Sequence, residues 1–318
     1  MVGTPMESSS AGVTVRRALE ASSPRYGEKA IKAFLFLCAA ISVAVTSAIV
    51  ISLFVPTFSF FREVSPWEFF TGTLWAPAFA NASFGVLPIV VGTLIVVTIS
   101  LGVAIPVGLL SSIYLSEYAP SGVRRIVKPA LEVLAGIPTV AIGLFAFWFI
   151  RPLAETLLPF LPWQGPFSIG VAAVAVGLLI VPVITSVSDD AMRAVPIALR
   201  EGAFALGASK FEVSTRVVFP AAVSGIVAAV VLAGSRAVGE TMVVLIAAGA
   251  GNPRLTFDPT KGVQTMTSFI AGRATGDIAT GTVVYDTIFA VGALLFVSTL
   301  VLNMIAIRFV RRFREVYE

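Results

Sequence analysis

Long apolar runs alternate with shorter polar segments along most of this 318-residue chain. A helix of about 20 apolar residues, rising 1.5 Å per residue, crosses a hydrocarbon core roughly 30 Å thick. Six of the runs are long enough, so we expect helices at residues 31–55, 86–113, 131–150, 168–187, 222–248 and 283–307. The pattern predicts an all-α integral membrane protein with six transmembrane helices.

Composition agrees with this fold class and excludes several kinds of chemistry. The chain is 57% hydrophobic and 13% charged, with a mean hydropathy of +0.94, which lies outside the range of soluble globular proteins. Its single cysteine, Cys38, excludes an intrachain disulfide, and the absence of histidine removes the commonest general base and metal ligand. We therefore expect no catalytic residues, no metal site and no cofactor in this chain.

Basic residues indicate the orientation. They concentrate in the two terminal segments and in the predicted loops at 114–130 and 188–221, whereas the alternate loops hold few. The positive-inside rule places such segments in the cytoplasm, so both termini are expected there, in a bacterial plasma membrane. The net charge of +4 is explained by this topology, and we expect the lipid bilayer and no nucleic acid as a partner.

The resulting organisation has four parts. They are a polar cytoplasmic N-terminal segment (1–30), a first transmembrane helix with its outer loop (31–85), a core of five transmembrane helices (86–307) containing the cytoplasmic loop 188–221, and a basic cytoplasmic tail (308–318).

The inner loop contains the stretch REGAFALGASKFEVSTRVVFPAA, residues 200–222. Its polar and apolar positions predict a short amphipathic helix that starts after Pro196 and ends near Gly207. A second short helix then leads to Pro220, at the mouth of the fifth run. Two helices lying on the membrane surface fit this pattern, and so does a projection that enters a groove of a soluble partner.

The spacing in this loop resembles the EAA loop of ABC-importer permeases. The residues that carry the resemblance are Glu201, Gly202, Ala203, Gly207, Val217, Phe219 and Pro220. The family has Ala, Ile and Leu where this chain has Gly202, Val217 and Phe219, but every spacing is kept. The resemblance implies that these residues couple the chain to a cytoplasmic ATPase, which we favour over the membrane-surface interpretation.

Further segments resemble the permeases of phosphate importers, of the PstC type more than of the PstA type. Among them are FGVLPIVVGTL (84–94), LAGIPTVAIGLF (134–145) and SRAVGETMVV (235–244). The resemblance implies a type I, MetI-like permease fold and ATP-driven import of inorganic phosphate. It also implies three partners, which are a PstA-like permease, a PstB-like ATPase dimer that holds ATP and Mg, and a PstS-like phosphate-binding protein.

Arg236 and Glu240 lie inside the predicted span 222–248. A charge near the bilayer centre costs about 2.5–3.5 kcal/mol on insertion scales, so such residues need a reason to be there. Four positions apart on one helix, they would share a face within reach of a salt bridge. They are either a packing pair or, as we favour, residues that line the substrate path, where a guanidinium can fork onto phosphate.

Several alternatives stay open from the sequence. The chain could be a PstA-like subunit, an ABC permease for sulfate or molybdate, or a stand-alone secondary transporter. It contains no G-x-x-x-x-G-K-[ST] stretch, so we expect ATP hydrolysis on another subunit and no enzyme activity here. The aromatic residues of loop 56–85 predict an interfacial belt, with partner docking as the alternative. Asp189 and Asp190 predict a solvated helix end, with bracing of the inner loop as the alternative.

Overall fold

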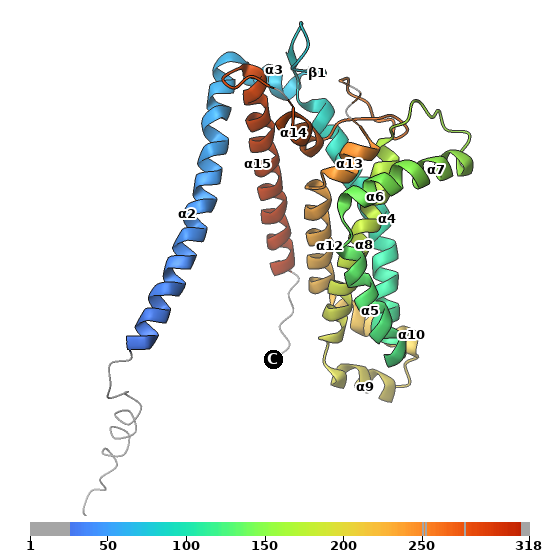
Figure 1. Ribbon diagram of the computed structural model, residues 1–318. Coiled ribbons are helices and arrows are strands. Elements are labelled where there is room, and N and C mark those ends of the chain that lie inside the picture. The colour runs from blue at the N-terminus through green and yellow to red at the C-terminus, as the bar shows by residue number, and fades with distance from the viewer. Residues whose placement is uncertain (1–25, 250, 252, 277, 313–318) are drawn as a thin grey trace, which may run out of the picture. The chain divides into compact units, whose positions relative to one another are not determined.

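The computed structural model describes residues 26–249, 251, 253–276 and 278–312. This part of the chain is mostly helical (Figure 1). It divides into two compact units, residues 1–52 and 53–318. Most of the predicted N-terminal segment 1–30 and the end of the predicted tail lie outside the described residues.

The helices and strands follow one another along the chain in a simple order. The α-helices are α2 (Tyr26–Glu63), α3 (Pro66–Thr71), α4 (Leu87–Ile113), α5 (Ser121–Ala135), α6 (Thr139–Phe145), α7 (Arg151–Leu157), α8 (Ile169–Arg193), α9 (Ile197–Ala205), α10 (Lys210–Glu212), α11 (Phe219–Ala221), α12 (Val223–Val238), α13 (Met242–Ala247), α14 (Met266–Ala274) and α15 (Val283–Arg312). Three π-helical segments continue neighbouring helices, namely η1 (Tyr114–Tyr118), η2 (Ala146–Ile150) and η3 (Val213–Val218). Strands β1 (Trp75–Ala76) and β2 (Ser83–Phe84) pair antiparallel, with Trp75 opposite Phe84.

Five helical stretches of the described chain are long and apolar enough to cross a membrane: residues 27–63, 87–118, 139–157, 169–193 and 283–308. A sixth is formed by residues 210–221 and 223–238, if these two helices, bent by 69° at their junction, count as one span. The predicted number of spans agrees with this upper count.

The first predicted helix, 31–55, is longer in the structure, where α2 covers Tyr26–Glu63, and two other predicted helices are interrupted. The run 131–150 is interrupted by Gly136, Ile137 and Pro138, so α5 is a separate amphipathic helix and the span starts at Thr139 and continues through α7. Proline restricts the residue before it to extended conformations, which explains this break. The run 222–248 is also discontinuous, because α12 ends at Val238 and α13 begins at Met242.

In the first unit, the described residues form most of α2. Every side chain from residue 27 to 49 is exposed, including large apolar ones such as Phe34 and Phe36. A helix that is apolar on all sides belongs in a membrane or a protein core. This unit therefore presents a lipid-compatible surface.

The core of the second unit is built on the packing of α4 against α8. Small residues bring the two backbones together, and a Cβ on Gly108 would lie 2.8 Å from the Cβ of Ile184. The Ser100 hydroxyl donates a 2.7 Å hydrogen bond to the carbonyl of Ala173 across the same interface. Close approach of this kind is typical of membrane helix pairs.

The outer-loop aromatics only partly fit the predicted belt. Phe60, Phe69 and Trp75 are buried in a cluster with Phe269 of α14, where the rings of Trp75 and Phe269 meet edge to face at 4.9 Å. The belt prediction is wrong for these residues, because they form a core beneath the loop. Trp67 stays 79% exposed and remains available for a lipid interface or a partner.

Candidate functional site

The two charged residues predicted for the fifth span lie on either side of a helix break. Arg236 is exposed in the last turn of α12, and Glu240 is 8% exposed in the non-helical stretch before α13. The predicted shared helical face is therefore wrong, because the helix ends between them. Among the described residues no ion pair joins Arg236 to Glu240, so the expected salt bridge is not formed.

One local contact and one contact from α14 stabilise this break between α12 and α13. The Glu240 carboxylate accepts from the backbone N–H of Val243 at 3.3 Å and so caps the start of α13. The Glu240 carbonyl accepts from the hydroxyl of Thr267, in the first turn of α14, at 2.7 Å. The Val243 N–H and the Glu240 carbonyl, two backbone groups at the break, therefore both have partners, as buried backbone groups in apolar surroundings require. Glu240 thus has a local structural role whatever else it does.

Arg236 stands on a polar strip that the sequence did not reveal. Its neighbour Ser235 donates a 2.8 Å hydrogen bond to the side-chain oxygen of Asn303 on α15, and this contact is exposed. Asn303 is a lone amide in the apolar run 283–307, a signal that could have identified it. Arg236 lies 13 residues, or about 20 Å, along α12 from its start at Val223, within the bent candidate span formed by residues 210–221 and 223–238.

This strip, Ser235, Arg236 and Asn303, constrains what the exposed side of α12 faces. Exposed charged and amide groups at membrane depth require water, an ion or a polar protein surface. A guanidinium that is exposed there keeps its N–H donors available for an anion. The arrangement suits an anion-lined passage or a polar interface with another transmembrane subunit.

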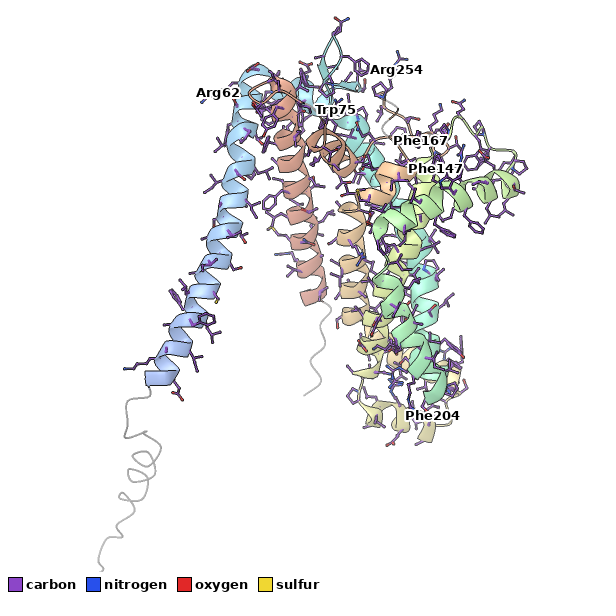
Figure 2. All side chains as sticks on the ribbon, in the orientation of Figure 1. Arg62, Trp75, Phe147, Phe167, Phe204 and Arg254 are labelled. Carbon is purple, nitrogen blue, oxygen red and sulfur yellow. The ribbon has the colours of Figure 1, made fainter. Side chains whose placement is uncertain are left out.

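The predicted inner loop forms a projection at one end of the second unit, opposite α3 and α14 (Figure 1). We call residues 197–221 the coupling segment. It contains α9, α10, η3 and α11, which confirms the two short helices expected from the sequence. Figure 2 shows Phe204 of α9 at this end and Trp75 at the other.

Two of the seven predicted coupling residues anchor the segment and four are exposed on it. Ala203 and Phe219 pack against a buried cluster formed by Met192, Val195, Val213, Val218, Ala222 and Ile226. Glu201, Gly202 and Gly207 are exposed, while Val217 is half-buried and Pro220 is exposed at the start of α11.

The glycines at two motif positions behave differently. Gly207 has φ +83°, a left-handed conformation that ends α9 as the sequence predicted. Gly202 has no such requirement, and a Cβ placed on it would meet no atom within 4 Å. An alanine would therefore fit at position 202. Two large apolar residues near Gly207 are exposed to solvent, Leu206 at 90% and Phe211 at 67%.

An enclosed ion-pair network lies beside the coupling segment. The side chain of Asp189 is 1% exposed and contacts Arg124 of α5 at 2.7 Å, Lys128 at 3.4 Å and Arg193 at 3.5 Å. The prediction of a solvated helix end is wrong for Asp189, which braces α5 against α8. It fits Asp190, whose side chain is 62% exposed although it also pairs with Lys128.

The charges in this network alter the pKa of Lys128. Burial lowers that pKa, but the hydrogen bond and charge of Asp190, together with those of Asp189, outweigh burial. The net pKa of Lys128 therefore lies above its ordinary value of 10.5, and the ammonium group stays charged at neutral pH.

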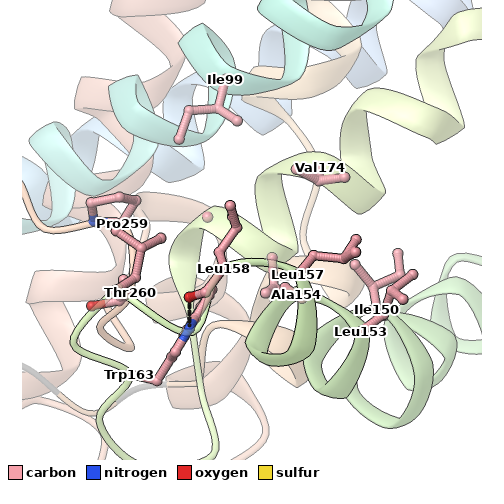
Figure 3. Close-up of a pocket in the computed structure, with 13 residues that line it drawn as sticks. Ile99, Ile150, Leu153, Ala154, Leu157, Leu158, Trp163, Val174, Pro259 and Thr260 are labelled. Carbon is pink, nitrogen blue, oxygen red and sulfur yellow. Dashed lines mark hydrogen bonds between the residues drawn. The ribbon is translucent and has the colours of Figure 1, made fainter.

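A large cavity of about 460 Å³ opens between α4, α7, α8 and the outer loops (Figure 3). Its walls are apolar side chains such as Ile99, Leu153 and Val174. The polar groups at its edge are already satisfied, since Trp163 donates to the carbonyl of Leu158 at 2.9 Å and Thr260 donates to Asp258 at 2.6 Å. The cavity offers nothing to an anion, so it is not the candidate path.

Comparison with known sequences identifies what this arrangement belongs to. Residues 104–315 match the family described as binding-protein-dependent transport system inner membrane component. The chain is 32% identical over 283 residues to the probable ABC transporter permease protein YqgH of Bacillus subtilis, covering 88% of this chain and 89% of that protein. It is 32% identical over 259 residues to the phosphate transport system permease protein PstC of Mesorhizobium japonicum, covering 76% and 77% of the two chains.

Solved structures share the fold at low sequence identity. A chain of a bacterial alginate ABC transporter, solved in complex with an alginate-bound periplasmic protein, has a TM-score of 0.62 at 15% identity and covers 93% of this chain and 100% of its own. A chain of the MetNI methionine ABC transporter in an inward-facing conformation has a TM-score of 0.54 at 19% identity, covering 70% and 94%. These similarities support the predicted type I permease fold.

Proposed function

Since the chain belongs to the family of binding-protein-dependent transport system inner membrane components, we propose that it is the permease subunit of an ATP-driven importer of inorganic phosphate. We propose phosphate as the substrate because the chain is similar, over about three quarters of its length, to permeases named PstC. Such a subunit conducts the substrate, and ATP hydrolysis takes place on another chain.

The polar strip on α12 and α15 supports a substrate path on that side of the molecule. Arg236 is exposed at membrane depth, where a guanidinium can donate two parallel hydrogen bonds to an oxyanion. Ser235 and Asn303 add neutral polar groups next to it. A path must bind its ion weakly enough to release it, and one accessible cation among neutral groups meets that need.

In our proposal, Glu240 shapes the substrate path indirectly, because it stabilises the helix break next to Arg236. Its carboxylate caps α13 and its carbonyl binds Thr267, so it fixes the point at which α12 ends beside Arg236. We retain both residues as path residues, Arg236 as the group that meets the anion and Glu240 as the group that shapes the break.

The coupling segment supports the attachment of a cytoplasmic ATPase. It presents Leu206 and Phe211 to solvent, next to the motif residues Glu201 and Gly207. Exposed large apolar side chains on a short projecting helix are typical of a surface that inserts into a partner's groove. We propose that a PstB-like ATPase dimer binds here, and that a PstA-like permease and a PstS-like phosphate-binding protein complete the transporter.

Uptake of radiolabelled phosphate into proteoliposomes tests the function directly. The liposomes would hold the complete four-component transporter, with ATP inside the vesicle compartment that faces the ATPase and the binding protein on the opposite side. We expect ATP-dependent phosphate accumulation that unlabelled phosphate suppresses. Accumulation of sulfate or molybdate in place of phosphate would refute the substrate while keeping the permease assignment, and uptake without the ATPase would refute the importer itself.

A further inference from the structure

One ion pair joins the coupling segment to the end of α4. Arg200 of α9 meets Glu117 of η1 with 2.5 Å between Nη1 and Oε1. The other branch of the same guanidinium donates a 2.7 Å hydrogen bond to the carbonyl of Met192, in the last turn of α8. A single side chain thus ties α9 to the inner ends of two membrane-spanning helices.

This pair is enclosed, unlike the other ion pair of the coupling segment. The side chains of Arg200 and Glu117 are 18% and 7% exposed. In contrast, Arg216 and Glu212 lie 3.8 Å apart with side chains 78% and 45% exposed. Exposed pairs contribute little, whereas enclosed charge-assisted hydrogen bonds are stronger and fix geometry.

The surroundings hold the carboxylate in place. The hydroxyl of Ser116 donates a 2.9 Å hydrogen bond to the same Oε1 of Glu117. On the next residue, the ring of Tyr118 lies 5.0 Å from the ammonium group of Lys210, where α10 starts. The π-helical turn η1 therefore contacts both short helices of the coupling segment, and such turns often occur at functional sites.

Besides these polar contacts, an apolar cluster joins the coupling segment to the spans, and several of its members are small side chains such as Ala191, Ala203 and Ala208. Apolar contacts are non-directional, so they hold the segment on the bundle without fixing its position along it. The forked hydrogen bonds of Arg200 are directional and supply that position.

We propose that Glu117 and Arg200 are positioning residues that make α9 move as one body with the inner ends of α4 and α8. This inference rests on the proposed function, in which a PstB-like ATPase dimer binds the coupling segment, and it adds that ATP hydrolysis moves this segment. A movement of α9 then reaches the spans through the Arg200 guanidinium. Without the pair, the ATPase still binds and hydrolyses ATP, but its movement is partly lost at the apolar contacts.

The test compares Glu117→Gln, Arg200→Gln and the double variant with the wild-type transporter. Arg125→Gln is the matched control, because Arg125 is an exposed arginine on α5 on the same side of the protein. Two quantities are measured on each purified transporter: phosphate imported per ATP hydrolysed, and the rate of trypsin cleavage after Lys210 and Arg216 of the coupling segment.

We expect both single variants to assemble and hydrolyse ATP, to import about five-fold less phosphate per ATP, and to be cleaved faster, five-fold being the lower end of usual coupling between linked sites. The double variant should match the more affected single variant, because both changes break the same interaction. The Arg125→Gln transporter should behave as the wild type.

Three results would overturn the proposal. Unchanged phosphate per ATP in both single variants means that the pair carries no movement. Loss of ATPase binding means that the pair only orders the docking surface, and strictly additive effects mean that the two residues act separately. A wild-type transporter that imports no phosphate refutes the proposed function instead, and the cleavage rates then still decide whether the pair fixes the coupling segment.

Discussion

The buried carboxylate of Asp189 gives the sharpest test of how α5 and α8 are held together. Asp189→Asn keeps the size of the side chain and removes its charge, leaving Arg124 and Lys128 without their shared counter-ion. Removing one partner of a buried ion pair costs about 3–5 kcal/mol. The Arg124 and Lys128 side chains keep 18% and 24% exposure, and Lys128 keeps Asp190, so we expect the lower end, about 3 kcal/mol.

Thermal unfolding of the purified chain in detergent measures this effect. Each kcal/mol shifts the Tm by roughly 2–4 °C in domains of 150–250 residues, so Asp189→Asn should lower it by about 6 °C or more. The neighbouring Asp190→Asn is the control, because it makes the same change on a side chain that is 62% exposed, and it should cost at most about 1 kcal/mol. Equal shifts for the two variants would refute the reasoning, since burial would then not decide the cost.

Three further expectations follow from single positions. Gly225→Ala should destabilise the chain by about 1–3 kcal/mol in the same thermal assay, because its Cβ would overlap the Cβ of Ala191, whereas Gly234→Ala, with its nearest neighbour at 3.6 Å, should be tolerated. Leu206→Ala should leave the Tm unchanged and weaken copurification of the ATPase, because this side chain, which directly follows α9, is 90% exposed; unchanged copurification contradicts the proposed docking surface. Hydrogen bonds from Thr260 lower the pKa of the Asp258 carboxyl below its ordinary 3.8, so the ionised carboxylate stabilises the fold above pH 3.8, and this stabilisation is lost as the pH falls through the lowered pKa. Asp258→Asn should therefore reduce the Tm near pH 7 but not at the acid end. A Tm deficit that persists in acid would show that the carboxylate charge is not the cause.

The sequence predicted the elements that depend on composition alone. Continuous apolar runs identified both ends of α4 and the starts of α8 and α15 to within one residue. The helices α8 and α15 continue about one and a half turns beyond their predicted last residues, 187 and 307. Gly207, with its positive φ, ended α9 as its residue type suggested. Spacing alone also identified the coupling segment, because a motif of small and apolar residues keeps its pattern whatever the rest of the chain does.

The features that could not be predicted from the sequence depend on contacts between residues far apart in the chain. Asp189 is buried by Arg124 and Lys128, which lie 65 and 61 positions earlier, so local polarity suggested a solvated end. The break after Val238 is stabilised by Thr267, whose hydroxyl reaches the Glu240 carbonyl from 27 positions away. Periodicity within one run carries no information about such partners, and an apolar run looks the same whether it is continuous or broken.

The path itself is tested most directly by phosphate uptake with Arg236 altered. Proteoliposomes holding the complete transporter would compare the wild type with Arg236→Gln and Arg236→Lys, after ATP hydrolysis and assembly are shown to be equal. We expect Arg236→Gln to lower uptake by about tenfold or more and Arg236→Lys to retain part of it, because lysine keeps the charge but lacks the fork. Equal uptake by the wild type and Arg236→Gln would contradict the account, since Arg236 would then only face a polar protein surface.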